Sequence, residues 1–321
     1  MPILPALQPL FRTIAQQGDA PSRNLPVREA RERAHAAMEQ YITGYYASVD
    51  PLPIERDLCV PVDGGFITVR LYAPSARQGP LPCHVYYHGG GFWLGRLKHF
   101  DPLCRASASD AQCAVASVDY RLAPEFKFPT AAEDAYAALL WLHENAGALN
   151  LDPTLMSVGG VSAGGNLAAV VCLMARERLG PPILLQVLEV PVLDLSTQKD
   201  LRIPEEAITL PSGKDLYCAY YLEDPVKALH PHVSPLHAAN LTALPRALIM
   251  IAEYDPLAAE GRAYTKLLSE AGVPTELIEW KGQFHGAQSM ARLIPDEAFS
   301  YHTRIVEFLR ENHGIANVRF E

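Results

Sequence analysis

Short apolar runs recur along the chain, and the segments between them carry apolar residues at every third or fourth position. The first pattern is typical of buried strands, and the second places apolar side chains on one face of a helix. The runs with strand composition lie at 83–87, 113–118, 155–158, 183–190, 247–252 and 276–280. Strands that alternate with helices predict an α/β protein, with a mostly parallel sheet and helices on both faces.

Two further apolar runs, 54–61 and 66–72, flank Asp63-Gly64-Gly65, a sequence typical of a tight hairpin turn. They bring the expected sheet to about eight strands. The clearest helices are expected near 257–271, near 296–312 and from Thr130 onward. The last begins with Thr-Ala-Ala-Glu, which fits a capping box.

Two regions depart from this alternation. Residues 1–50 are mostly helical in pattern, most clearly at Val27–Tyr46, and residues 196–230 form a long insertion that contains a cluster of tyrosines. Insertions of this length between strands commonly act as lids over a site. A helical decoration far from the site is the alternative.

Composition narrows the range of partners. The 321 residues carry a formal charge of −9 with both signs interspersed, which argues against nucleic-acid binding and leaves a small molecule as the expected partner. The longest apolar segment, Pro182–Leu195, is interrupted by Gln186, Glu189 and Asp194, so no membrane span is expected. The N-terminus lacks the pattern of a signal peptide, and a cytoplasmic location is expected.

The cysteines are scattered and form no Cys-x-x-Cys pair, so we expect reduced core thiols rather than a disulfide framework or a metal site. They are Cys59, Cys83, Cys104, Cys113, Cys172 and Cys218.

A serine lies between a predicted strand and a predicted helix, in the sequence Gly160-Val161-Ser162-Ala163-Gly164. Glycines two positions before and after a serine allow a turn too tight for side chains. Such a turn lifts the hydroxyl above the sheet edge, next to free N–H groups at the helix N-terminus. The pentapeptide alone also fits an inert strand-to-helix turn.

A glycine-rich loop follows the strand that ends at Tyr87. Its sequence is His88-Gly89-Gly90-Gly91-Phe92-Trp93. Backbone N–H groups without neighbouring side chains can point at one spot and stabilise the oxygen of an ester carbonyl as it gains charge. Phosphate binding is the alternative, but the glycine spacing of dinucleotide sites and the Gly-Lys-Ser/Thr of phosphate loops are absent.

An acid and a histidine each follow one of the last two predicted strands. Asp255 ends the run at 247–252 and precedes a helix, and His285 follows the run at 276–280. A serine hydroxyl needs a base to take its proton, and the base needs an acceptor that fixes its tautomer. Ser162, Asp255 and His285 therefore form a complete set, in the chain order of the α/β-hydrolase plan.

From about Val85 to Gly286 the chain resembles the hormone-sensitive-lipase-like (bacterial family IV) esterases of the α/β-hydrolase superfamily. The residues that carry the resemblance are His88-Gly-Gly-Gly-Phe92, Asp119-Tyr-Arg-Leu-Ala-Pro-Glu125, Phe128-Pro129, Glu133-Asp134-Ala135, Ser162-Ala-Gly-Gly-Asn-Leu-Ala168, Asp255-Pro-Leu257 and His285-Gly286. The resemblance implies a carboxylesterase with Ser162 as nucleophile, His285 as general base and then acid, and Asp255 orienting it.

The resemblance also implies an oxyanion hole made by the N–H groups of Gly90, Gly91 and Ala163, with Gly89 shaping the turn. It implies that residues 1–50 and 196–230 form a helical cap on a catalytic domain spanning 51–321. No metal or organic cofactor is required. An apolar substrate pocket is expected at Phe92, Trp93, Val161, Leu257, Phe284 and Tyr217.

Three departures from the family pattern concern the substrate. Val161 stands before the nucleophile where Asp or Thr is common, Ala258 and Ala259 replace an Arg-Asp pair, and Ala287 stands where Phe is frequent. Uncharged esters of short to medium acids are the expected substrates.

Two other functions stay open at this stage. The same residues could hydrolyse an amide, a lactone or a carbamate, or the fold could serve as a non-catalytic receptor for a small molecule. Either a monomer or a homodimer is compatible with the sequence.

Overall fold

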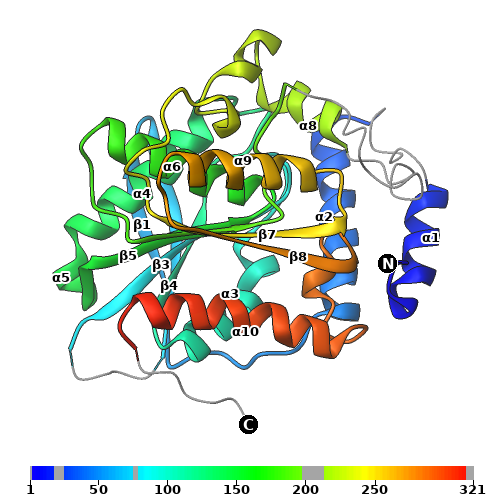
Figure 1. Cartoon of the computed structure of the whole chain (residues 1–321), viewed down its shortest axis with the longest axis horizontal. Coiled ribbons are helices and arrows are strands. Elements are labelled where there is room, and N and C mark those ends of the chain that lie inside the picture. The colour runs from blue at the N-terminus through cyan, green and yellow to red at the C-terminus, as the bar shows by residue number, and fades with distance from the viewer. Residues whose placement is uncertain (1, 18–24, 75–78, 197–212, 316–321) are drawn as a thin grey trace.

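An eight-stranded sheet forms the centre of the protein (Figure 1), in a computed structural model that describes residues 2–17, 25–74, 79–196 and 213–315. In chain order the strands are β1 (Ile54–Val62), β2 (Gly65–Ala73), β3 (Leu81–Tyr87), β4 (Ala114–Asp119), β5 (Leu151–Val161), β6 (Leu185–Glu189), β7 (Arg246–Tyr254) and β8 (Thr275–Phe284). Their order in the sheet is β1-β2-β4-β3-β5-β6-β7-β8. The pairs from β4 to β8 are parallel, and β1 and β2 form the predicted antiparallel hairpin.

Helices cover both faces of the sheet, which confirms the α/β fold class. The α-helices are α1 (Gln8–Gln17), α2 (Val27–Tyr45), α3 (Leu97–Ala111), α4 (Thr130–Glu144), α5 (Ala146–Leu149), α6 (Ala163–Glu177), α8 (Lys214–Tyr221), α9 (Ala258–Glu270) and α10 (Pro295–Asn312). Short 3-10 helices lie at η1 (Pro5–Leu7), η3 (Pro225–Leu229), η4 (Pro235–His237) and η5 (Ala287–Ser289). Helices α4, α6 and α9 pack on one face, and α3 and α10 pack on the other (Figure 1).

The alternation of side chains along each strand builds two hydrophobic layers. In β3 the side chains of Val85 and Tyr87 belong to the cluster under α4 and α6, while Tyr86 belongs to the cluster under α3 and α10. All seven residues of β3 are buried, because a central parallel strand is covered on both faces. Strand β3 therefore contains few polar residues, whereas the edge strands β1 and β8 are partly exposed and carry several.

Two local predictions are wrong. Thr130 is the first residue of α4 rather than its cap, since Pro129 precedes the helix and no side chain caps it. Glu133 cannot complete a capping box because its carboxylate binds Arg178 at 2.7 and 2.8 Å. Cys59, expected in the core, is exposed on the edge strand β1.

Helix α2 is anchored against the loops that follow β3 and β4. Arg31 donates hydrogen bonds to the carbonyls of Trp93 (2.8 Å) and Ala123 (2.6 Å) and forms an ion pair with Glu125. Of the expected cap insertion, residues 197–212 lie outside the described residues, and the remainder includes α8. The division into a cap and a catalytic domain stays a prediction.

Candidate active site

Ser162 lies on the turn between β5 and α6, with a backbone conformation (φ 58°, ψ −115°) that non-glycine residues rarely adopt. The turn is this tight because the two flanking glycines lie against the end of β3. A Cβ on Gly160 or Gly164 would overlap the carbonyl oxygen of Tyr87. Backbone hydrogen bonds hold the strained residue, since Ser162 N–H donates to the carbonyl of Glu189 (2.8 Å) and its own carbonyl accepts from Asn166 (3.1 Å).

The structure brings the three predicted residues into one chain of hydrogen bonds. His285 Nε2 lies 3.0 Å from Ser162 Oγ, and its Nδ1 lies 2.7 Å from Asp255 Oδ2. Asp255 is 1% exposed, and its other oxygen, Oδ1, accepts the N–H of Leu257 at 2.8 Å. The carboxylate is therefore fixed from both sides. In this arrangement Nδ1–H donates to Asp255, and Nε2 is left as the acceptor for the serine proton.

Two opposing effects set the pKa of His285. Burial disfavours the imidazolium cation, but the charge and hydrogen bond of Asp255 more than offset it, so the pKa lies above its usual value of 6.5. A base of this kind is strong enough to take the serine proton, and the cation that results is stabilised by the adjacent carboxylate.

The glycine loop after β3 lies beside the serine. Gly90 and Gly91 have positive φ angles of 123° and 59°, and a Cβ at Gly91 would come within 2.9 Å of Tyr217. Within the described part of the chain, the N–H groups of Gly90, Gly91 and Ala163 donate to no acceptor. Gly89 packs against Val161, where a Cβ would lie 3.0 Å from the carbonyl oxygen. Three amides are thus available near Ser162 for an oxyanion.

His88 and Tyr120 support this loop, a role that the sequence reasoning missed. The two rings stack with centroids 4.2 Å apart, and the Tyr120 hydroxyl donates to the His88 carbonyl at 2.8 Å. His88 Nδ1–H donates to the Gly89 carbonyl at 2.8 Å. Burial lowers the pKa of His88 to about 4, so the ring is neutral and supports the loop without a charge. The position of His88 directly before the three glycines is the sequence feature that could have indicated this supporting role.

Of the predicted pocket residues, Phe92 belongs to the core. It has no solvent-accessible surface, and its ring stacks on Tyr221 of α8 with centroids 3.9 Å apart. A side chain without accessible surface does not line an open pocket, so its assignment there is wrong. Trp93 is also mostly buried and packs edge-on against Tyr220. Tyr217 lies over Gly91 of the glycine loop.

Phe284 and His285 line an open cavity of about 360 Å³, which we call the His285 cavity. Its other walls come mainly from α2 and α3 and include Tyr41, Ile42 and Phe100. Val161 is partly buried against the cluster under α3 and α10, and Leu257 is buried two residues after Asp255. The N-terminal helix α2 therefore contributes directly to the space beside the histidine.

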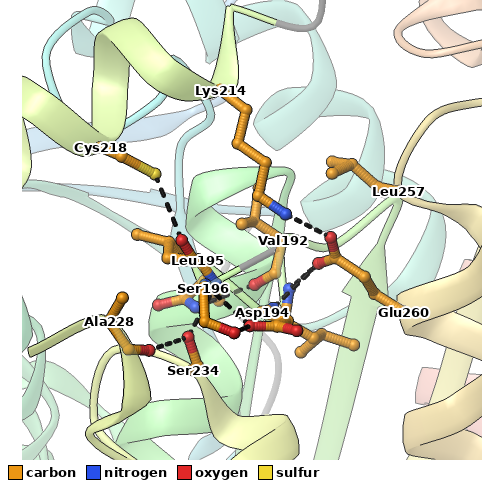
Figure 2. A network of polar contacts seen from close by, with 12 residues as sticks. Val192, Asp194, Leu195, Ser196, Lys214, Cys218, Ala228, Ser234, Leu257 and Glu260 are labelled. Carbon is orange, nitrogen blue, oxygen red and sulfur yellow. Dashed lines mark hydrogen bonds and ion pairs between the residues drawn. The ribbon is translucent and has the colours of Figure 1, made fainter. Parts of the chain in front are cut away.

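A buried ion pair joins α8 to α9 (Figure 2). Lys214 Nζ lies 2.6 Å from Glu260 Oε1, while Oε2 accepts the backbone N–H groups of Leu193 (2.7 Å) and Asp194 (2.9 Å). Burial raises the pKa of Glu260, and Lys214 acts in the opposite direction. Helix α8, which carries Tyr217 over the glycine loop, is thereby linked to α9, which follows Asp255.

Replacing Lys214 with Met should lower the free energy of unfolding by about 3 kcal/mol, because a buried carboxylate loses its cation and retains two amide donors. Urea denaturation measures this loss. Lys266→Met, at an exposed pair with Glu270, serves as the control and should change stability little. Equal stability of the two variants would contradict a stabilising role for the pair.

Neither a metal site nor a membrane span stands out in the described segments. They contain no group of three or more histidine, cysteine, aspartate or glutamate side chains placed to hold an ion. No helix within them has both the length and the apolar character needed to cross a bilayer.

The sheet topology, the nucleophile turn and the Ser-His-Asp arrangement define a serine hydrolase of the α/β-hydrolase class. Residues 84–289 match a family described as having the alpha/beta hydrolase fold. The chain belongs to the hormone-sensitive-lipase-like branch of this family, which confirms the predicted resemblance and the carboxylesterase class.

Individual relatives support this membership. The chain is 41% identical over 241 residues to a carboxylesterase, NlhH, of Mycobacterium tuberculosis, covering 72% of this chain and 74% of the relative. It is 37% identical over 241 residues to an arylesterase of Saccharolobus solfataricus, covering 74% and 78%. A solved structure of a hyperthermophilic esterase from Pyrobaculum calidifontis superposes with a TM-score of 0.88 at 36% identity, covering 97% of this chain and 99% of that one.

Proposed function

We propose that this protein hydrolyses carboxylic esters through an acyl-enzyme intermediate, with Ser162 as the nucleophile, His285 as general base and acid, and Asp255 as the residue that orients it. The observation that carries the proposal is the continuous chain from Ser162 Oγ through His285 to the buried Asp255. Three amides beside the same hydroxyl, which donate to no acceptor in the described segments, support it.

In the first half of the reaction, Ser162 Oγ attacks the ester carbonyl as His285 Nε2 takes its proton. The amides of Gly90, Gly91 and Ala163 hold the oxyanion, and each such donor typically contributes about 100- to 1,000-fold. The imidazolium then protonates the leaving alcohol. In the second half, water attacks the acyl-enzyme by the same route and releases the acid.

We propose uncharged esters of short to medium acids as substrates. The apolar walls of the His285 cavity, including Ile42, Phe100 and Phe284, favour such groups over charged ones. A small-molecule ester is the proposed partner, with no metal or organic cofactor in the reaction. The cytoplasmic location and the monomeric or homodimeric state stay predictions.

Two alternatives are separated from this proposal by one experiment. The protein is incubated with a fluorescent organophosphate and, separately, with matched aryl esters, anilides, lactones and carbamates. We expect a covalent adduct on Ser162 and fastest turnover of the esters. Absence of any adduct would favour a non-catalytic receptor, and faster turnover of another class would reassign the reaction.

The value of kcat/KM should fall at acidic pH, with the midpoint of the fall above pH 6.5. His285 must be neutral to accept the serine proton, and Asp255 raises the pKa of the imidazole above its usual value. The rate should therefore fall as the pH drops through that raised pKa. Initial rates on a neutral ester check this, with intrinsic fluorescence as a control for folding. An acid limb centred below pH 6 would contradict the effect of Asp255.

A further inference from the structure

A second cavity, of about 330 Å³, lies on the face of the sheet covered by α3 and α10, beneath the end of β6. Its walls are mainly apolar and include Leu103, Ala106, Ala298 and Ile305. One carboxyl group, that of Glu189, also lines it. We call this space the Glu189 cavity. Its volume falls in the range of small-molecule sites, about 300–1,000 Å³.

The Glu189 cavity adjoins the catalytic groups. The backbone carbonyl of Glu189 accepts the N–H of Ser162 at 2.8 Å, and Glu189 is the register partner of Val161, so its side chain leaves the sheet on the same face as that of Val161. Another wall includes Ser289, four residues after His285. Tyr46 lines both the Glu189 cavity and the His285 cavity. The two cavities therefore share a wall residue, Tyr46.

Polar side chains form part of the lining of this otherwise apolar cavity. The hydroxyl of Tyr86 and the side-chain oxygen of Gln288 are buried and have no hydrogen-bond partner within the described part of the chain. The Tyr301 hydroxyl interacts with the Glu189 carboxyl as a hydrogen-bond donor, which lowers the pKa of Glu189. Buried polar atoms are costly unless they are paired. Their convergence on one cavity points to a ligand with a polar end.

The hydrogen-bonding capacity of these atoms indicates which polar group the end of the ligand carries. Glu189 and Gln288 offer acceptors and the Tyr86 hydroxyl can donate, while Tyr301 orients the Glu189 carboxyl. A hydroxyl group both donates and accepts, whereas an ammonium group only donates. Burial also raises the pKa of Glu189 to about 7, with Tyr301 and His302 acting in the opposite direction, so the carboxyl is largely uncharged below neutral pH. A neutral hydroxyl can pair with either form of the carboxyl.

The acyl arm of an ester is the better candidate for this space than the alcohol arm. The alcohol must leave before water attacks, and it needs an open path past His285. The acyl group stays attached to Ser162 from the departure of the alcohol until water attacks, so it can occupy a cavity whose lining residue Glu189 is hydrogen-bonded to the Ser162 backbone.

We propose that the Glu189 cavity binds the end of the acyl chain and that Glu189, with Tyr86, Tyr301 and Gln288, selects chains that end in a hydroxyl group. This inference rests on the proposed function. It names a substrate class, esters of hydroxy acids, and a set of specificity-determining residues.

The test compares two ethyl esters of nearly equal length, ethyl 6-hydroxyhexanoate and ethyl heptanoate, by titration of the released acid. The quantity of interest is the ratio of their kcat/KM values. We expect Glu189→Leu to lower this ratio about tenfold relative to the wild type, as loss of one buried hydrogen bond would. Glu189→Gln keeps an acceptor and a donor and should restore most of the ratio.

A matched control shortens an apolar side chain in the wall of the same cavity. Ile305→Val should change both rates together and leave the ratio as it is. Tyr301→Phe provides a second probe of the polar cluster if Glu189→Leu does not fold, and it should lower the ratio several-fold.

Two results would overturn the inference. One is an equal ratio in the wild type, Glu189→Leu and Tyr301→Phe, which would leave the cluster as a structural feature. The other is a preference for ethyl 6-aminohexanoate over the hydroxy ester, which would make the cavity a cation site. Failure of the proposed function is distinguishable from failure of this inference. In the first case the wild type would hydrolyse neither these esters nor a simple ester such as ethyl acetate.

Discussion

Ser162→Ala should lower kcat for ester hydrolysis by about a million-fold while leaving the fold and substrate binding intact. The reason is that the three residues act as a unit. Without Oγ, His285 has no proton to take, and the oxyanion amides can stabilise only a much slower attack by water. Alanine suits the site, since Ser162 makes its structural hydrogen bonds through the backbone.

The measurement is single-turnover and steady-state hydrolysis of an aryl ester, with thermal unfolding as a check on the fold. Ser300→Ala, at an exposed position of α10, is the control and should behave as the wild type. Retention of even about one per cent of the activity in Ser162→Ala would show that another nucleophile operates, since loss of the nucleophile alone removes far more. Organophosphate labelling would then locate it.

The closeness of Ser162, Asp255 and His285 was predictable from the sequence, because it depends on residue type and on where strands end. Gly160 and Gly164 are constrained by contact with Tyr87, a local requirement visible as a motif. The carboxyl ends of parallel strands share one sheet edge, so Asp255 and His285 could be expected near Ser162 before any distance was known. The central strands were predictable for a related reason, since strands buried on both faces form continuous apolar runs, as in β3.

The predictions that failed depend on contacts between distant segments. Phe92 is next to the glycine loop in sequence, but Tyr221 of the insertion covers its ring and places it in the core. Glu133 fits a capping box, but Arg178, 45 residues away, binds it instead. Neither partner is identifiable from local spacing, because many side chains of each type could fill the role.

The two cavities were equally inaccessible to sequence reasoning. The Glu189 cavity is formed by residues from β3, α3, β6, α10 and the segment after α2, including Tyr46, Tyr86 and Tyr301. In the sequence, Glu189 only interrupts an apolar run, and that interruption was useful solely as evidence against a membrane span. Its position one strand from the nucleophile depends on the register of β5 and β6, in which Val161 pairs with Glu189.

Asp255→Asn should reduce kcat by about ten-thousand-fold at neutral pH with little change in structure. The structure explains why an isosteric change is so costly here. Asp255 Oδ1 already accepts the N–H of Leu257, so the amide oxygen of the substituted side chain would keep that place and its NH₂ group would face His285 Nδ1. An NH₂ donor requires Nδ1 to be the acceptor, which moves the ring proton to Nε2.

In that tautomer Nε2 carries a hydrogen and cannot take the proton of Ser162, from which it lies 3.0 Å. The variant also loses the charge that raises the pKa of His285, so the acid limb of the remaining activity should move to lower pH. Rates measured between about pH 5 and 10 test both effects. Asp296→Asn, at an exposed position in the first turn of α10, is the matched control. A loss below about 100-fold would mean that Asp255 does not fix the tautomer.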